Sequence, residues 1–105
     1  MRLTGEAKEK FEKWYLKTIE IVEMESIDES FDINGFYDLP QSMQFGVLQD
    51  WADSMGYEIN VLRIHENDYD WSVWVDEEAK IQTAKTRQEA RNAAIDKLNE
   101  IVNEK

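Results

Sequence analysis

"YEINVLRIHENDYDWSVWV", residues 57–75, is the stretch that decides the fold of this chain of 105 residues. Apolar side chains stand at every second position of its two halves, at Tyr57, Ile59 and Val61 and again at Trp71, Val73 and Val75. A repeat of two residues is typical of a β-strand that buries one face, and it leaves Trp74 on the opposite face. The polar segment between the halves predicts a turn. The sequence therefore predicts an antiparallel pair of strands over residues 57–65 and 70–76.

The chain that follows this pair predicts a third strand and a helix. Residues 76–78 are acidic and indicate a second turn, and AKIQTA, residues 79–84, is a shorter strand. Thr86 and Glu89 then have the spacing of a capping box, which marks the start of a helix. We expect that helix over residues 86–103. Its expected buried face comprises Ala90, Ala93, Ala94, Leu98, Ile101 and Val102.

The chain before the strands predicts two helices joined by a loop. Apolar residues recur at steps of three and four after Thr4, which predicts a helix from Thr4, as N-cap, to about Met24. Residues 25–37 are acidic and carry the turn signal Asn34-Gly35, so we expect a loop there.

The second helix is expected to begin with Asp38 as N-cap and to end at Gly56. Its expected buried stripe is Met43, Val47, Trp51 and Met55. The sequence thus predicts one α+β domain, residues 1–105, with an N-terminal helix over 1–24, an acidic loop over 25–37 and an α-β-β-β-α core over 38–105. The core is a three-stranded antiparallel meander with helices on one face.

The net charge of −11 is unevenly distributed along the chain. Residues 18–79 hold sixteen acidic side chains and a single basic one, Arg63, whereas the flanking segments are both weakly basic. The acidic middle predicts a protein partner with a basic surface. The alternative is a charged surface that only keeps the protein in solution.

The residues that usually carry chemistry are scarce. The chain has no cysteine and one histidine, His65, and it contains neither a phosphate-binding loop nor a nucleophile motif. We therefore expect no enzymatic activity, no cofactor and no metal. No apolar run approaches the roughly 20 residues that span a membrane, and the N-terminus is charged, so we expect a cytoplasmic protein that does not enter membranes.

From residue 38 onward, the order helix, three strands, helix resembles the double-stranded RNA-binding domain. Residues 86–94, TRQEARNAA, resemble the basic opening of that family's last helix. The resemblance implies a nucleic-acid site at Lys85, Arg87 and Arg91, with Gln88 in place of one cation. The acidic residues Glu66, Asp68 and Asp70 oppose the approach of a polyanion. We therefore do not expect nucleic acid as a partner.

Three segments resemble small accessory proteins of bacteriophages and prophages: LTGEAKEKFEKWYL (3–16), FYDLPQSMQFGVLQDWADSMG (36–56) and RQEARNAAIDKLNEI (87–101). The resemblance implies a protein that binds another protein, such as a host nucleic-acid-binding or defence protein that its acidic surface would inhibit. The candidate binding residues are Asp68, Asp70, Trp74, Asp76, Glu77 and Glu78. A structural protein that associates with itself is a further alternative, and the sequence leaves the oligomeric state open.

Overall fold

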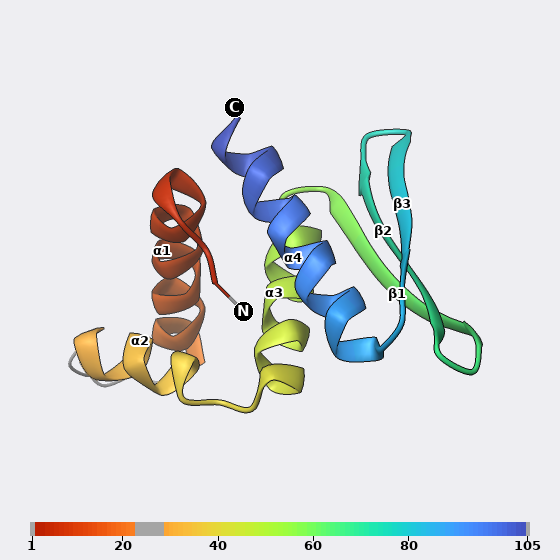
Figure 1. The fold of residues 1–105 in the computed structure, drawn as a ribbon. Coiled ribbons are helices and arrows are strands. Elements are labelled where there is room, and N and C mark those ends of the chain that lie inside the picture. The colour runs from red at the N-terminus through yellow and green to blue at the C-terminus, as the bar shows by residue number, and fades with distance from the viewer. Residues whose placement is uncertain (1, 23–28, 105) are drawn as a thin grey trace.

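The computed structural model describes residues 2–22 and 29–104. The elements follow in the order α1 (Gly5–Val22), α2 (Glu29–Tyr37), α3 (Gln41–Ser54), β1 (Tyr57–His65), β2 (Asp68–Val75), β3 (Glu78–Ala84) and α4 (Arg87–Asn103). Helices precede a three-stranded antiparallel sheet, and a C-terminal helix follows it (Figure 1). The predicted α+β class is therefore confirmed.

The sheet is a meander in the order β1-β2-β3, as predicted from residues 57–75 and from the shorter strand at residues 79–84. Val73, in the central strand, lies opposite Ile59 of β1 and Lys80 of β3. Each turn contains two residues, of which Asn67 and Asp76 have a φ of 58°. Asparagine and aspartate tolerate this left-handed conformation better than most residues, so both turns have suitable side chains.

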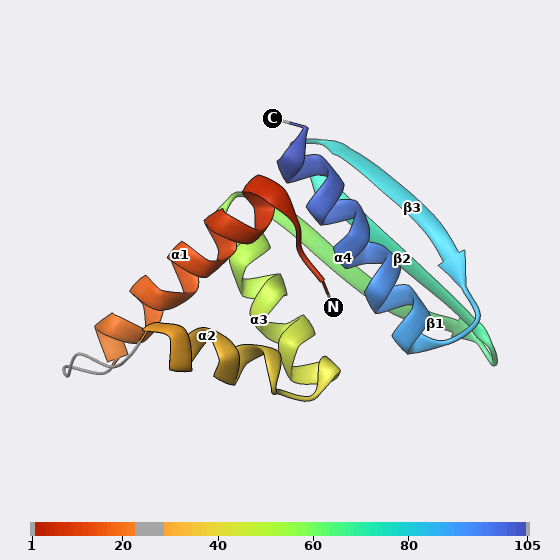
Figure 2. The same ribbon diagram turned by 60° about the vertical axis from the view of Figure 1, so that its left-hand side comes forward.

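The elements form three layers (Figures 1 and 2). The sheet is the first layer, and α3 and α4 pack together on one of its faces, α3 against β1 and α4 mainly against β2. On the far side of these helices, α1 packs against α4 and α3, and α2 packs against α1. The central layer is therefore covered on both sides, whereas the sheet is covered by helices on one.

The core lies between the sheet and α4 and continues between the helices. The predicted burial of Ala90, Ala94, Leu98 and Val102 is confirmed, while Ala93 and Ile101 are half-buried against the core. Ile95, which the expected buried face omits, is fully buried as well. The alanines without exposed surface bring the backbone of α4 close to the strands.

Aromatic rings join α1, α2 and α3. Phe11 has no exposed surface, and its ring centroid lies 4.7 Å from that of Phe36 on α2 and 5.4 Å from that of Trp51 on α3. Tyr15 extends the cluster, with its ring 5.3 Å from that of Phe36. Such ring pairs add to the stability that buried apolar area provides.

The prediction of a loop over residues 25–37 is wrong for residues 29–37, which form α2; residues 25–28 lie outside the described residues. Helical hydrogen bonding continues through the supposed Asn34-Gly35 turn, because the amide of Asp38 donates to the carbonyl of Asn34 at 3.0 Å. Phe36 is 1% exposed, and its burial anchors the helix. Tertiary packing here outweighs a local turn signal.

The start of α3 also differs from the prediction. The helix begins at Gln41, and Pro40 occupies the N-cap position without a side-chain hydrogen bond. Asp38 is not the N-cap, because its amide already continues the hydrogen bonding of α2. Leu39 separates the two helices, and a residue before proline disfavours helical geometry. At the other end, Gly56 adopts a φ of 80° and ends the helix as predicted.

The buried face of α3 is rotated relative to the predicted stripe. Met43 is 55% exposed, whereas Gln44, next to it, is 5% exposed. The Nε2 of Gln44 donates to the carbonyls of Tyr37, at 3.0 Å, and Leu39, at 2.9 Å, and so ties the end of α2 to α3. Trp51 is buried as predicted.

An asparagine clasp, made by Asn99 and Asn103 of α4, holds the start of α1. Thr4 precedes the helix as predicted, and its amide donates to Oδ1 of Asn99 at 2.8 Å. The amide of Ala7 lies in the first turn, where no carbonyl of the same helix can accept it, and it donates to Oδ1 of Asn103 at 2.9 Å. The side-chain cap of α1 therefore comes from α4. Gly5 has a φ of 59°, and a β-carbon there would lie 3.0 Å from Oδ1 of Asn103.

Stability at high pH should depend on Tyr37. Its hydroxyl donates to Glu12 at 3.2 Å, and burial, with the charge of Glu12, raises the pKa of Tyr37 from its ordinary value of 10.0 to about 12. The protonated hydroxyl therefore stabilises the fold fully below about pH 10, and this contribution is lost as the pH rises to about 12. Urea titrations should show that the advantage of the wild type over Tyr37→Phe shrinks across this interval. A constant difference would contradict the assignment.

Candidate protein-binding face

One face of the sheet carries no helix from the described ranges 2–22 and 29–104. Strand alternation places nine residues on it, which we call the open face: Glu58, Asn60 and Leu62 of β1, Asp70, Ser72 and Trp74 of β2, and Ala79, Ile81 and Thr83 of β3. The register aligns them in three rows across the strands. The rows are Leu62–Asp70–Thr83, Asn60–Ser72–Ile81 and Glu58–Trp74–Ala79.

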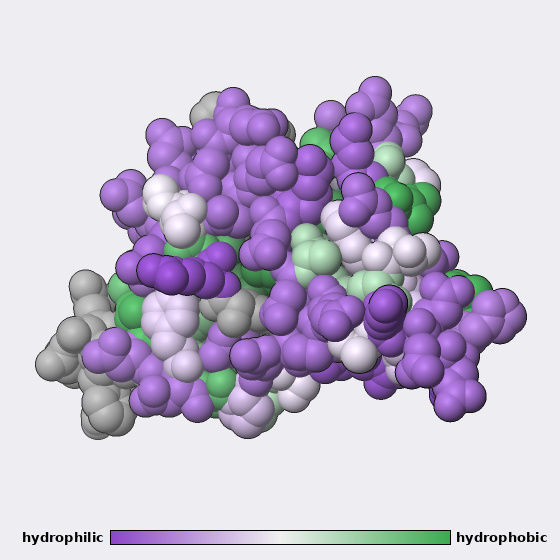
Figure 3. Space-filling model, viewed as in Figure 1, coloured by the Kyte–Doolittle hydropathy of each residue, from purple (hydrophilic) through white to green (hydrophobic). Residues whose placement is uncertain are grey.

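The open face exposes large apolar side chains. Leu62 is 61% exposed, Ile81 is 58% exposed and Trp74 is 37% exposed. Ile64 lies just beyond them at the β-bulge of β1 and is also exposed. Figure 3 shows small separate hydrophobic patches over the strands at its right, within a surface that is otherwise mainly hydrophilic. A group of exposed apolar side chains on one surface is typical of an interaction site.

The open face is acidic. It contains Glu58 and Asp70 and no lysine or arginine. The basic residues of the strands, Arg63 and Lys80, pair with Tyr69 and Val73 and therefore project toward the side that carries the helices. Between described residues, the structure has one ion pair, Lys97–Glu100 on α4, so neither open-face carboxylate is paired with a cation among these residues.

The six residues predicted as a protein-binding site do not form one cluster. Asp70 and Trp74 share the open face, and Asp68 lies at the start of the same strand. Residues 76 and 77 form the turn at its other end, about 20 Å from Asp70 along an extended strand. Glu78 pairs with Val75 and projects toward the helix side. The predicted set therefore contributes two residues to the open face and acidic groups at the ends of β2.

Leu62 and Ile81 are the residues of this surface that the predicted site omits. A signal for Leu62 is present in the sequence, because β1 has apolar residues on both of its faces: Tyr57, Ile59 and Val61 on one, Leu62 and Ile64 on the other. A strand with one covered face needs apolar residues on that face alone. The second apolar set therefore indicates another surface to cover.

The alternative nucleic-acid site is positioned by aromatic rings. The guanidinium of Arg87 lies over the ring of Tyr69, 5.6 Å from its centroid, and that of Arg91 lies 5.4 Å from the centroid of Phe45. Arg91 is half-buried, whereas Lys85 and Arg87 are exposed. Both arginines thus help to join α4 to its neighbours through cation–π contacts.

The basic residues of α4 lie far from the start of α1. The first turn of α1 contacts the C-terminal part of α4 through Asn99 and Asn103. Arg87 and Arg91 occupy the opposite end of α4, about 20 Å away along a helix of 17 residues. Thr86 accepts a hydrogen bond from the amide of Glu89 at 3.1 Å, so one of the amides that could hold an anion is already occupied.

Double-stranded RNA should bind weakly or not at all at physiological salt. The basic patch contains only Lys85, Arg87 and Arg91, and the carboxylates of the chain repel phosphate. In a titration of labelled duplex RNA at about 150 mM salt, we expect affinity below the ~10⁻⁴–10⁻⁶ M range of non-specific binding. Arg87→Glu/Arg91→Glu provides the control. Micromolar binding that this variant abolishes would instead assign the basic patch as the functional site.

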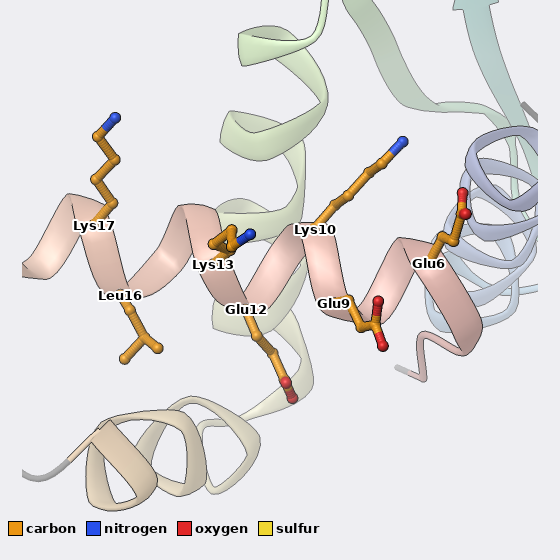
Figure 4. Close-up of a pocket in the computed structure, with 7 residues that line it drawn as sticks. All are labelled: Glu6, Glu9, Lys10, Glu12, Lys13, Leu16 and Lys17. Atoms are coloured by element: carbon orange, nitrogen blue, oxygen red, sulfur yellow. The ribbon is translucent and has the colours of Figure 1, made fainter.

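Two hollows lined by described residues do not resemble reaction sites. One runs along α1, where Lys10 and Lys17 project to one side and Glu12 and Leu16 to the other, toward α2 (Figure 4). A second lies between β3 and α4, with Trp71, Gln82 and Lys97 among its lining residues. His65 is exposed opposite Asp68 at the end of β1. Across residues 2–22 and 29–104, no group of three histidine or carboxylate side chains is arranged to hold a metal ion.

Comparisons with known proteins do not assign the chain to a family. No protein-family model matches it, and neither a search of curated proteins nor one of solved structures gives a significant match. In the part of the chain that the structure describes, no helix has both the length and the apolar character needed to cross a membrane.

Proposed function

We propose that this chain is a small acidic accessory protein of bacteriophage type that acts without catalysis, by binding another protein through its open face. It would act in the cytoplasm of the host cell. Its target would be a host nucleic-acid-binding or defence protein that presents a basic surface. The basic patch at Lys85, Arg87 and Arg91 is the alternative site, and the cation–π contacts of its arginines make it the weaker candidate.

The observation that carries the proposal is the exposure of Leu62, Trp74 and Ile81 on a face without a basic residue. Transfer of a leucine or isoleucine side chain from water to a protein interior contributes about 1.5–3 kcal/mol. The neighbouring carboxylates add selectivity for a cationic partner and speed its association more than they strengthen binding. An apolar centre within a charged rim is the usual anatomy of a protein interface.

The size of the open face indicates that the interface extends beyond it. Three strands of seven to nine residues present a surface of only about 10–15 by 25 Å. A stable interface buries about 800 Å² on each partner, which is more than this surface provides. The acidic turns at residues 66–67 and 76–77 lie at the ends of the strands and are the natural extension.

The test is capture of partners by tagged protein from a bacterial host, followed by mass spectrometry. Wild-type protein should retain a partner with a basic surface, and Leu62→Ser/Ile81→Ser should lose it, because the variant removes apolar contacts without altering charge. Met43→Ser is the matched control, since Met43 is similarly exposed but lies on α3. All three proteins should have the same thermal midpoint. Capture that persists in the double variant but is lost in Met43→Ser would refute the proposed face.

A further inference from the structure

The width of the open face suits a single α-helix. The outer strands of a three-stranded sheet lie about 10 Å apart, which matches the 10–12 Å diameter of a helix with its side chains. β1, the longest strand, has nine residues and spans about 30 Å. We infer that the occupant of the open face is a basic amphipathic helix of the partner protein. This inference rests on the proposed function and specifies the element that the face binds.

The apolar residues form a triangle that a helical stripe can cover. Leu62 and Trp74 are two rows and one strand apart, about 14 Å, and Ile81 lies in the row between them. Apolar residues at helical spacings of three and four span about 10 Å over seven residues and about 16 Å over eleven. A stripe of three turns therefore contacts all three side chains. The partner helix would complete a sheet with helices on both faces.

Charge selects a basic helix over a second copy of this chain. Glu58 lies in the row of Trp74 near one end of the face, and Asp70 lies in the row of Leu62 near the other. The turns beyond each end add Glu66, Asp76 and Glu77. Two open faces brought together would place carboxylates against carboxylates without a cation on either face, which is unfavourable. A helix with lysine or arginine in its first and last turns meets an acidic group at both ends.

The probe is a synthetic helical peptide of about 18 residues, long enough for the strands, with a leucine stripe and lysines in its terminal turns. The peptide is titrated into isotope-labelled protein, and amide NMR signals are followed. The signals of Leu62, Asp70, Trp74 and Ile81 should shift, while the signals of α1 should stay unchanged. The same peptide with glutamate in place of lysine should bind at least about tenfold more weakly. A peptide with the same composition but no continuous stripe should bind weakly as well.

Charge reversal on the protein gives the complementary arm. Glu58→Lys/Asp70→Lys should lower the affinity for the lysine peptide about tenfold. Glu9→Lys/Asp53→Lys makes the same change in net charge at exposed positions of α1 and α3 and should leave the affinity unchanged. Equal binding of lysine and glutamate peptides, or shifts that map outside the strands, would overturn the inference.

The failure of this inference can be distinguished from the failure of the proposed function. If peptides do not bind but partner capture still depends on Leu62 and Ile81, the open face binds a protein through another kind of element. If sedimentation shows a dimer that Leu62→Ser/Ile81→Ser dissociates, the occupant is a second copy and the basic helix is excluded. If neither peptide binding nor capture depends on these residues, both proposals are wrong.

Discussion

Phe11→Ala should lower the free energy of unfolding by about 3–5 kcal/mol, which is among the largest effects expected of a single substitution in this chain. The ring of Phe11 has no exposed surface and contacts rings from three helices: Trp14 and Tyr15 on α1, Phe36 on α2 and Trp51 on α3. Removal leaves a cavity that these large, mutually packed rings can fill only in part. The loss therefore combines the transfer free energy of the ring with the cost of the cavity.

Urea unfolding followed by tryptophan fluorescence measures this change. Lys13→Ala is the control, because it makes a truncation on the exposed surface of the same helix and should change stability by less than about 0.5 kcal/mol. The m-value of Phe11→Ala also carries information. A lower m-value would show that α1 and α2 separate from the rest of the fold before it unfolds, whereas an unchanged m-value would show one cooperative unit. A loss below 1 kcal/mol would contradict the packing described above.

Ala94→Phe should destabilise the fold by about 1–3 kcal/mol or more, through the opposite mechanism. Ala94 is fully buried where α4 packs against the sheet, so a ring at this position has no space without displacement of the helix. Thermal unfolding should show a clearly lower midpoint. Asp96→Phe places the same ring on an exposed position of the same helix and should have a small effect. Equal midpoints for Ala94→Phe and the wild type would refute close contact between α4 and the sheet.

Much of the fold could be predicted from the sequence because local signals and tertiary packing agree there. The alternation of residues 57–75 coincides with burial on one face of β1 and β2. The hydroxyl of Thr86 accepts a hydrogen bond from the amide of Glu89, as predicted. The returning bond differs from a capping box, because Oε2 of Glu89 accepts from the amide of Lys85, at 3.3 Å, and not from that of Thr86. Where two independent signals coincide, the element and its boundary are both well specified.

The first third of the chain was harder to predict because its local signals conflict with its packing. In α2, Ile33, Phe36 and Tyr37 have the spacing of one helical face, but acidic residues and Asn34-Gly35 obscure it. The helix is anchored by the contact of Phe36 with Phe11, twenty-five positions earlier in the sequence. A contact between residues so far apart in the chain cannot be predicted from a short segment of sequence. The same holds for Asn103, whose role as the cap of α1 depends on the packing of α4.

The candidate site was predicted in part for a related reason. Acidic residues are visible in a sequence, so Asp70 was identified together with Trp74 on the same strand. The face they share is defined by strand register, which brings Leu62 and Ile81 to the same surface from the two neighbouring strands. Residues 76 and 77 are close to Asp70 and Trp74 in the sequence, but they lie in the turn at the far end of the strand.

The asparagine clasp has a consequence for the order of events during synthesis. The ribosome delivers α1 first, whereas Asn99 and Asn103, which hold Thr4 and the amide of Ala7, leave the exit tunnel some 95 residues later. Until then the first turn of α1 lacks its partners, and a nascent chain carries this helix without its cap. Closure of so long a loop is entropically unfavourable and is among the slower steps of folding. Completion of the helical layers thus waits for the last-made helix, so a chain that stalls before Asn99 lacks the cap of its first helix although the aromatic residues of α1, α2 and α3 are already synthesised.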